Sequence, residues 1–344
     1  MLTDRQSFQG MKPLVPNDMK IRQNLLNSSK VFIKESLKFI KSVMTKTNLS
    51  QERGRRYIKE ILHSIFFIGY INKPPINPRD ILETDLHSKL FEKFPDVFQL
   101  YETQLPRRPP FSVLLEVVVE TTGDRSVTAI LEVLQKLNDD MIIRRSEGNF
   151  CGNDFCFGAT VVSCSYFQRG GQKTQNYFGA SVSCKGRKAT RIFICLACIE
   201  TWNDNVTHAV CLAAEHHRSI RLPDAVYSMA YQVCRVREGE NYSHMYTPLL
   251  PCSLCQNIFQ NVTFSPPATA GQDKASWNYG NCAECEAISN LLNGEITVNE
   301  EAQQLNARLM PSLRTLRGHR KQRLRDHLNE HNFNVIPVTT FYNP

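Results

Sequence analysis

Cysteine pairs are the feature that most constrains this sequence. Three Cys-x-x-Cys pairs lie in the C-terminal half of the 344-residue chain: Cys195 with Cys198, Cys252 with Cys255, and Cys282 with Cys285. Paired cysteines with this spacing are typical of zinc sites in proteins whose thiols stay reduced. A chain of this length buries a large core without a metal. A zinc ion would therefore have a local structural or catalytic purpose.

Two of the pairs stand at predicted helix starts. Cys252 and Cys255 open a short helical segment at 252–260, and Cys282 and Cys285 open another. The positive end of a helix dipole lowers the pKa of a thiol, and the thiolate is the form that binds zinc. Two helix starts that supply thiolates to one ion satisfy the ligand preference of zinc. We therefore predict a zinc ion at these four cysteines, with four unrelated reduced thiols as the alternative.

The third pair has a different setting. Cys195 and Cys198 lie within an apolar run at 191–200, which predicts a buried strand. Side chains three residues apart on a strand point to opposite faces of the sheet. Buried cysteine commonly serves as a small apolar side chain. We therefore expect both to fill the core, with a contribution to zinc binding as the alternative.

Composition and charge restrict the class of protein. The chain is 42% hydrophobic and 22% charged, which is typical of a globular protein. Its apolar runs are shorter than the ~18 residues that span a membrane, and its first residues are too polar for a signal peptide. We expect a cytoplasmic or nuclear protein that is neither secreted nor inserted in a membrane. The net charge of +8 indicates attraction to polyanions.

Hydrophobic periodicity divides the chain into parts. Residues 1–19 predict a flexible arm, 20–105 a helical N-terminal domain with Ser50 as an N-cap, and 111–344 an α/β domain. Within the last part we expect strands at 157–166, 177–184, 191–200 and 225–236, and helices at 206–217 and 312–331. The first two strands flank a turn at Gly170 and Gly171. The predicted fold is α/β, a mixed sheet flanked by helices.

Two short motifs resemble the zinc motifs of the cytidine deaminase superfamily. The run GNCAECEAISNLL, with Cys282 and Glu284, resembles the first motif, and LLPCSLCQNIF, with Cys252 and Cys255, resembles the second. The resemblance implies a deaminase-like sheet, zinc held by the three cysteines, and Glu284 as the catalytic residue that activates a zinc-bound water. The same runs also resemble an uncharacterised, immune-induced vertebrate family, which implies a role in immunity but no mechanism.

Two features separate the chain from that superfamily. The order of the two motifs along the chain is reversed, and Cys285 is placed to fill the fourth coordination position. A zinc ion with four thiolates leaves no position for water and is structural. Both features favour a non-catalytic, deaminase-like zinc protein that binds a protein or nucleic-acid partner. A zinc-dependent deaminase that uses Glu284 is the alternative, because two motifs match at two helix starts.

The predicted C-terminal helix at 312–331 is strongly basic. Intermittent leucines along it indicate an amphipathic helix packed on the domain. Clustered lysine and arginine also neutralise phosphates, so binding of RNA or DNA is the functional alternative. The candidate phosphate-binding residues are Arg314, Arg317, Arg320, Lys321, Arg323 and Arg325.

Overall fold

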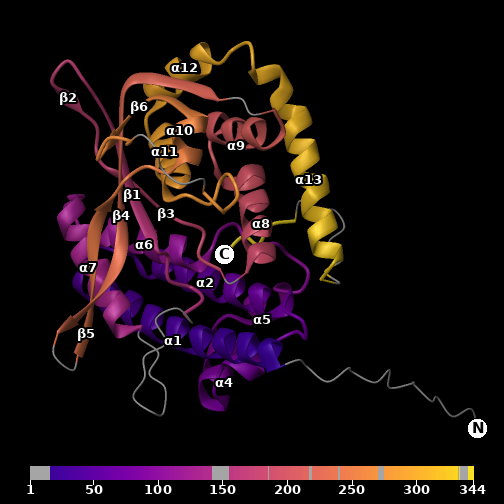
Figure 1. Cartoon of the computed structure of the whole chain (residues 1–344). Helices are drawn as coiled ribbons and strands as arrows, with labels where there is room; N and C mark the ends of the chain where they lie inside the picture. Colours follow the sequence, from indigo (N-terminus) through magenta and orange to yellow (C-terminus); the bar gives the residue numbers. More distant parts are fainter. Residues whose placement is uncertain are drawn as a thin grey trace, which may run out of the picture.

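The computed structural model describes residues 16–141, 155–184, 186–216, 219–238, 241–269, 275–331, 333 and 340–344. These residues form a mixed α/β fold whose N-terminal region is helical (Figure 1), as predicted. Most of the predicted arm at 1–19 lies outside the described residues, and α1 begins at Pro16. None of the described helices combines the length and the apolar character needed to cross a bilayer.

The N-terminal helices begin and end where local chemistry dictates. The long helices α1 (Pro16–Lys46) and α2 (Gln51–Tyr70) are separated by Ser50, whose hydroxyl accepts a hydrogen bond from the Arg53 amide at 3.2 Å. This confirms the predicted N-cap. Shorter helices follow, α3 (Pro78–Ile81), α4 (Thr84–Lys93), α5 (Pro95–Leu100), α6 (Pro110–Thr121) and α7 (Val127–Asp140). Proline at the first position starts three of them because its fixed φ suits a helix start.

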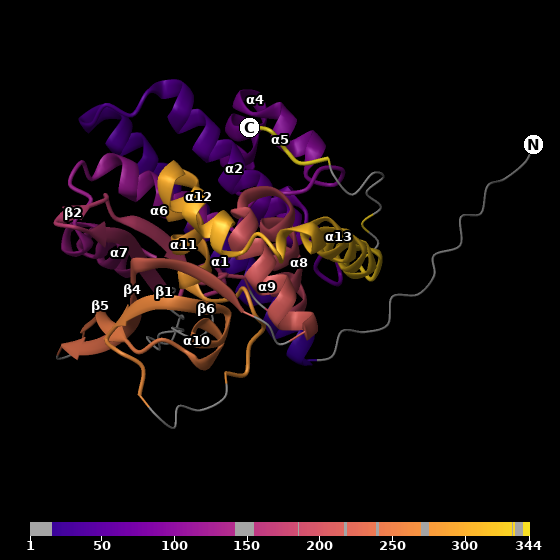
Figure 2. The same ribbon diagram turned by 90° about the horizontal axis from the view of Figure 1, so that it is seen from above.

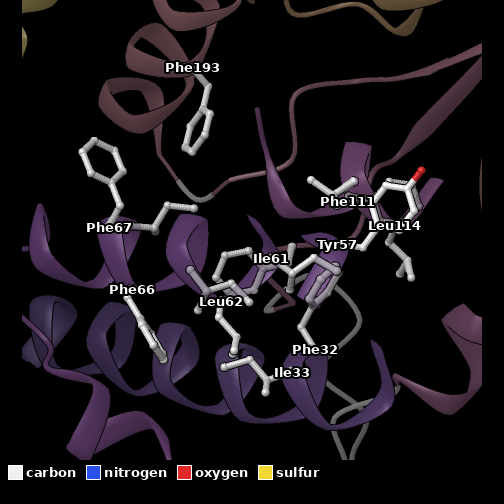
Figure 3. Close-up of a cluster of buried hydrophobic side chains, with 14 of the residues drawn as sticks. Phe32, Ile33, Tyr57, Ile61, Leu62, Phe66, Phe67, Phe111, Leu114 and Phe193 are labelled. Atoms are coloured by element: carbon white, nitrogen blue, oxygen red, sulfur yellow. The ribbon is translucent and has the colours of Figure 1, made fainter. Parts of the chain in front are cut away.

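A single hydrophobic cluster joins the N-terminal helices to the rest of the chain. Phe67 on α2 packs edge to face against Phe193, with ring centroids 6.3 Å apart (Figure 3). The C-terminal residues also return to this region, where the Leu105 amide donates to the carbonyl of Thr340 at 2.9 Å. The two expected domains, 20–105 and 111–344, therefore share one core.

The sheet is mixed and is organised around one long strand. Strand β4 (Ile220–Glu238) pairs antiparallel with β1 (Val161–Arg169) and β5 (Asn241–Leu249), and parallel with β6 (Phe259–Ser265). On its other side β1 pairs antiparallel with β2 (Gln172–Lys173) and β3 (Tyr177–Ala180). The turn between β1 and β2 uses Gly170 and Gly171, with φ of +59° and +83°. The pairing of β1 with β2 and β3 confirms the predicted hairpin. Glycine suits both turn positions because it adopts a positive φ without strain.

The strand predicted at 191–200 is wrong. This run lies in helix α8 (Arg187–Leu196) and in the π-helical turn η2 (Ala197–Thr201), which lead to α9 (Asp204–His216). A short apolar run does not distinguish a buried strand from a buried helix, and here both sides of the run are covered by protein. In this helical segment Cys195 and Cys198 lie about one helical turn apart, and not on opposite faces of a sheet as predicted.

The C-terminal helices complete the layers (Figures 1 and 2). The short helix α10 (Ser253–Ile258) joins β5 to β6, and α11 (Ala283–Gly294) packs on β3, β1 and β4. Helix α12 (Ile296–Leu305) packs on β4, and η3 (Met310–Ser312) leads into α13 (Leu313–Asn329). The predicted basic helix is thus α13, and it lies beside α8 and α9.

Acid should destabilise the protein through His63. This side chain is 1% exposed and stacks on Tyr342, and burial lowers its pKa from 6.5 to about 3. Below the unfolded-state pKa the unfolded chain binds a proton that the folded chain excludes, so stability falls as pH drops from about 6.5 toward 3. Between about pH 7 and pH 5 the unfolding free energy of His63→Phe should fall by about 2 kcal/mol less than that of the wild type. Denaturant unfolding at both pH values measures this difference.

The wild type, measured at the same two pH values, gives the reference loss of stability. An unchanged acid loss in His63→Phe would contradict the prediction.

Candidate metal centre

Close packing of α11 on β3 sets the position of the site. A Cβ atom on Gly179 would lie 2.2 Å from the backbone nitrogen of Ala287 and 2.6 Å from the carbonyl oxygen of Ala283. Both distances are shorter than any van der Waals contact, so only glycine lets the helix lie directly on the strand. The first turn of α11 is thereby fixed above the hairpin of β1 and β3.

A buried carboxylate anchors the same helix. Glu286 accepts hydrogen bonds from the Ala180 amide at 2.7 Å and from the Ser112 hydroxyl at 3.0 Å. Burial raises the pKa of Glu286, while these hydrogen bonds act in the opposite direction. Ahead of the helix, the Val182 amide donates to the carbonyl of Asn281 at 3.1 Å. These contacts fix both the rotation and the start of α11.

Cysteines occupy the N-cap positions of both α10 and α11. Cys252 precedes α10 and Cys282 precedes α11, each with extended backbone angles and without a side-chain cap hydrogen bond. The side chain of Gln256 donates to the carbonyl of Pro251 at 3.0 Å, which secures the approach to α10. The predicted arrangement of two helix starts is confirmed, with Cys252 and Cys282 as the N-cap residues.

Three sulfur atoms meet between these helix starts. The Sγ atoms of Cys252, Cys255 and Cys282 all lie within 4.8 Å of one another, and those of Cys252 and Cys282 are 3.3 Å apart. Zinc–sulfur bonds of about 2.3 Å in a tetrahedron place neighbouring sulfurs about 3.8 Å apart. This group of cysteines therefore fits a zinc ion in both ligand type and spacing. Within the described part of the chain it is the one group that could hold a metal ion.

The protonation of the three thiols is unequal. Cys252 accepts hydrogen bonds from the thiols of Cys255 and Cys282, which lowers its pKa to about 3. The same contacts, together with burial, raise the pKa of Cys255. The hydrogen bonds of the cluster therefore favour the thiolate form at Cys252, which is the form that binds a metal.

The fourth predicted ligand lies elsewhere. Cys285 does not belong to the group of sulfurs within 4.8 Å. Its side chain is 0% exposed and packs in a second hydrophobic cluster with Val210 and Ile288, and burial raises its pKa. The start of α11 is rotated so that this residue faces the core between α9 and the sheet. Three thiolates without a fourth leave one position of a tetrahedral ion open.

Glu284 occupies the side of α11 that faces the thiols. Its side chain is 4% exposed and its carboxylate interacts with the Cys255 thiol. Burial raises its pKa to about 7, and the negative charge of Cys252 contributes in the same direction. The sequence-predicted catalytic residue thus lies beside three of the four predicted ligands.

A cavity of about 610 Å³ opens over the thiols and Glu284. The ends of β1 and β5 form one side through Val161 and Leu249, and Trp277 forms another. Trp277 is 46% exposed, and its Nε1–H donates to Cys282 Sγ at 3.1 Å. A volume of this order is typical of small-molecule pockets.

The other predicted site residues lie apart from this centre. Cys195 is 2% exposed and Cys198 is 0% exposed, as expected of core residues. On α13, Arg320 is buried and donates to the Val210 carbonyl, and Arg317 pairs with Asp204. The remaining candidates for phosphate binding, Arg314, Lys321, Arg323 and Arg325, are exposed or half-buried. The set of six therefore does not form one free basic surface.

Two residues of the site were not predicted. Trp277 lies five residues before Cys282, and Glu286 lies two residues after Glu284. The periodicity of α11 places Glu286 on the face away from the thiols, which could have indicated an anchoring role. Nothing in the sequence indicates that the indole of Trp277 turns toward a sulfur.

Comparison of this chain with family models, with curated proteins and with solved structures finds no match.

Gly179→Ala should displace α11 and disrupt the thiol cluster. The added methyl group overlaps backbone atoms that cannot move independently, so we expect a loss of about 3 kcal/mol or more in unfolding free energy. Metal content should fall in parallel, because Cys282 moves with the helix. Gly318→Ala is the control, since a Cβ there contacts nothing within 4 Å, and it should be neutral or stabilising. Equal stability of the two variants would refute the packing argument.

One zinc ion per chain should be lost on removal of any of the three clustered thiols. Cys252→Ala should abolish stoichiometric zinc and lower the melting temperature, because ligand bonds contribute to folding free energy. Cys285→Ser should retain zinc, since that sulfur lies outside the cluster. Metal analysis of the purified proteins measures both. Equal zinc in the wild type and Cys252→Ala, or none in the wild type, would exclude the site.

Proposed function

We propose that this chain is a zinc-dependent hydrolase of the deaminase type, which replaces the amino group of a nitrogen heterocycle with oxygen. The observation that carries the proposal is the position of Glu284 beside a three-thiol cluster on the floor of an open cavity. The sequence favoured a closed site with four thiolates. The placement of Cys285 in the core favours the hydrolytic alternative instead.

The donor set suits this chemistry. Catalytic zinc sites have three protein ligands and keep one position for water or substrate, whereas structural sites have four. Zinc held by Cys252, Cys255 and Cys282 would supply a Lewis acid that makes a coordinated water acidic. The three thiols come from two helix starts fixed against the sheet, so the centre is rigid before substrate arrives.

Glu284 would move the proton during the reaction. A carboxylate oxygen of Glu284 takes one proton from the attacking water and gives it to the ring nitrogen, as the water oxygen bonds to the amidine carbon of the substrate. The carboxylate then takes the remaining hydroxyl proton and gives it to the departing amino group, and the carbon–nitrogen bond breaks as the carbonyl forms. One water is consumed, and a carbonyl product and ammonia are formed. Glutamate within reach of both oxygen and nitrogen is the usual group for such a transfer.

The walls of the cavity favour a flat heterocycle. Trp277 presents an exposed indole, and Val161 and Leu249 present apolar side chains. Planar bases stack on indole rings, and such stacking contributes about 1–3 kcal/mol per base. Asn281 supplies a polar group at the same cavity, able to bond the edge of a base. These features support an aminated pyrimidine or purine as the substrate class.

Ammonia release provides the test of the proposed reaction. Zinc-loaded protein is incubated with cytidine, adenosine, and single-stranded RNA and DNA, and ammonia and product bases are measured. Glu284→Gln should keep zinc and lower turnover by about 10²–10⁴-fold, because it removes the general acid–base group. Cys285→Ser should keep both zinc and turnover.

A structural zinc site predicts the opposite pattern. In that case Cys285→Ser weakens zinc binding, Glu284→Gln changes neither zinc nor stability, and the wild type releases no ammonia from any of the four substrates. That combination would overturn the proposed function and restore the non-catalytic alternative.

A further inference from the structure

Trp277 also lines a second cavity. This cavity encloses about 550 Å³ between α8, α9, α13 and the segment before α11. Its walls include Ile194 on α8 and Ala213 on α9, together with the aromatic rings of Trp277 and Tyr279. Of the described side chains, only Trp277 lines both this cavity and the one over the thiols. The second cavity is therefore a separate site.

A buried guanidinium forms part of its wall. Arg320 is 6% exposed and lines this cavity. Its Nε–H donates to Cys211 Sγ at 3.3 Å, and its Nη2 donates to the carbonyl of Val210 at 3.2 Å. These two bonds fix the orientation of the guanidinium.

No carboxylate pairs with Arg320 among the ion pairs of the described side chains. Burial lowers the pKa of Arg320, but the surrounding thiols of Cys198, Cys211 and Cys195 raise it above its ordinary value, so the guanidinium keeps its charge. An anionic ligand in the cavity would pair with that charge through a charge-assisted hydrogen bond.

Further positive charges face the same space. Arg191 on α8 and Arg323 on α13 also line the cavity. Two carboxylates lie there as well, but Glu330 pairs with Lys188 at 2.9 Å, and Asp326 accepts a hydrogen bond from Gln322 at 2.9 Å. By contrast, the described lining of the cavity over the thiols contains no lysine or arginine. The second cavity thus suits an anionic ligand better than the cavity over the thiols does.

We propose that this cavity binds a small phosphorylated molecule, with its phosphoryl group at Arg320, Arg191 and Arg323 and its planar or apolar part against Trp277 and Tyr279. Guanidinium groups bind phosphate through paired, charge-assisted hydrogen bonds, and several of them converge here. The neighbouring indole and phenol rings favour an aromatic group in the remainder of the ligand. The proposal is independent of the hydrolase activity, since it involves none of the clustered cysteines and not Glu284.

Calorimetric titration of the full chain provides the test, with inorganic phosphate, adenosine and adenosine monophosphate as probes. We expect one adenosine monophosphate per chain, bound more tightly than inorganic phosphate and more tightly than adenosine, which lacks the phosphoryl group. Arg191→Met and Arg320→Met should each weaken binding by about tenfold or more, because each removes a charge-assisted hydrogen bond. Arg191 is exposed, so its replacement keeps the test valid if Arg320→Met fails to fold.

Arg314→Met is the matched control, since Arg314 is exposed on the same helix and does not line the cavity. It should bind adenosine monophosphate as the wild type does. The chain has two tryptophans, and Trp202 is 8% exposed, so any quenching by the nucleotide should disappear in Trp277→Phe. No binding by the wild type, binding of adenosine equal to that of its monophosphate, or equal losses in Arg314→Met and Arg191→Met would overturn the proposal.

Discussion

Between Gly179 of β3 and the first turns of α11 there is no room for a side chain, and the candidate site depends on this contact. A helix at ordinary distance from a sheet keeps side chains between the two. Here the backbone of the strand touches the backbone of the helix, so the helix cannot slide or rotate without losing the contact. Cys282 and Glu284 are carried by the first turn of that helix. Their position relative to α10 therefore follows from a missing Cβ atom on a strand.

The same helix connects the sheet to the N-terminal helices. Glu286 accepts from the hydroxyl of Ser112 on α6, and near it Arg108 forms a half-buried ion pair with Glu60 of α2 at 2.8 Å. Buried charges require such partners, because an unpaired one costs several kcal/mol. The hydrogen bonds and ion pairs at this junction therefore hold only in one arrangement of the helices, whereas the apolar contacts around them tolerate small shifts. Together with the shared hydrophobic cluster, these polar contacts join the helical region to the sheet.

Sequence patterns predicted those parts of the fold in which local chemistry decides the outcome. The N-cap at Ser50, the glycine turn before β2 and the helix starts at Cys252 and Cys282 follow from side chains that act on their own backbone. The segment at 191–200 depends instead on what surrounds it, because an apolar run is compatible with either a buried helix or a buried strand. Strands β5 and β6 were not predicted for the same reason, since β4 is long enough to pair with both and supplies their context.

Three of the four predicted zinc ligands could be identified from spacing, but the fourth could not. Cys252 and Cys255 stand at the N-cap and third positions of α10, and Cys282 and Cys285 stand at the same positions of α11. Local geometry is thus equivalent in the two pairs, and only the contact of each helix with the rest of the protein distinguishes them. Helix α11 is pressed onto the sheet, which places Cys285 in the core. Arg320 is a similar case, because no helical pattern reveals that one cation of a basic helix faces inward.

Trp277 is the element through which two chemically different cavities meet. Its indole N–H bonds to the sulfur of Cys282, so the orientation of the ring depends on the state of that sulfur. Zinc at the proposed centre and the phosphorylated ligand proposed for the cavity between α8, α9 and α13 would both act on this ring. If each of them fixed the position of the ring, binding of one would change the free energy of binding of the other. Such coupling is reciprocal by thermodynamic necessity, so a ligand that favoured the ring position of the zinc-bound state would bind more tightly when zinc is present.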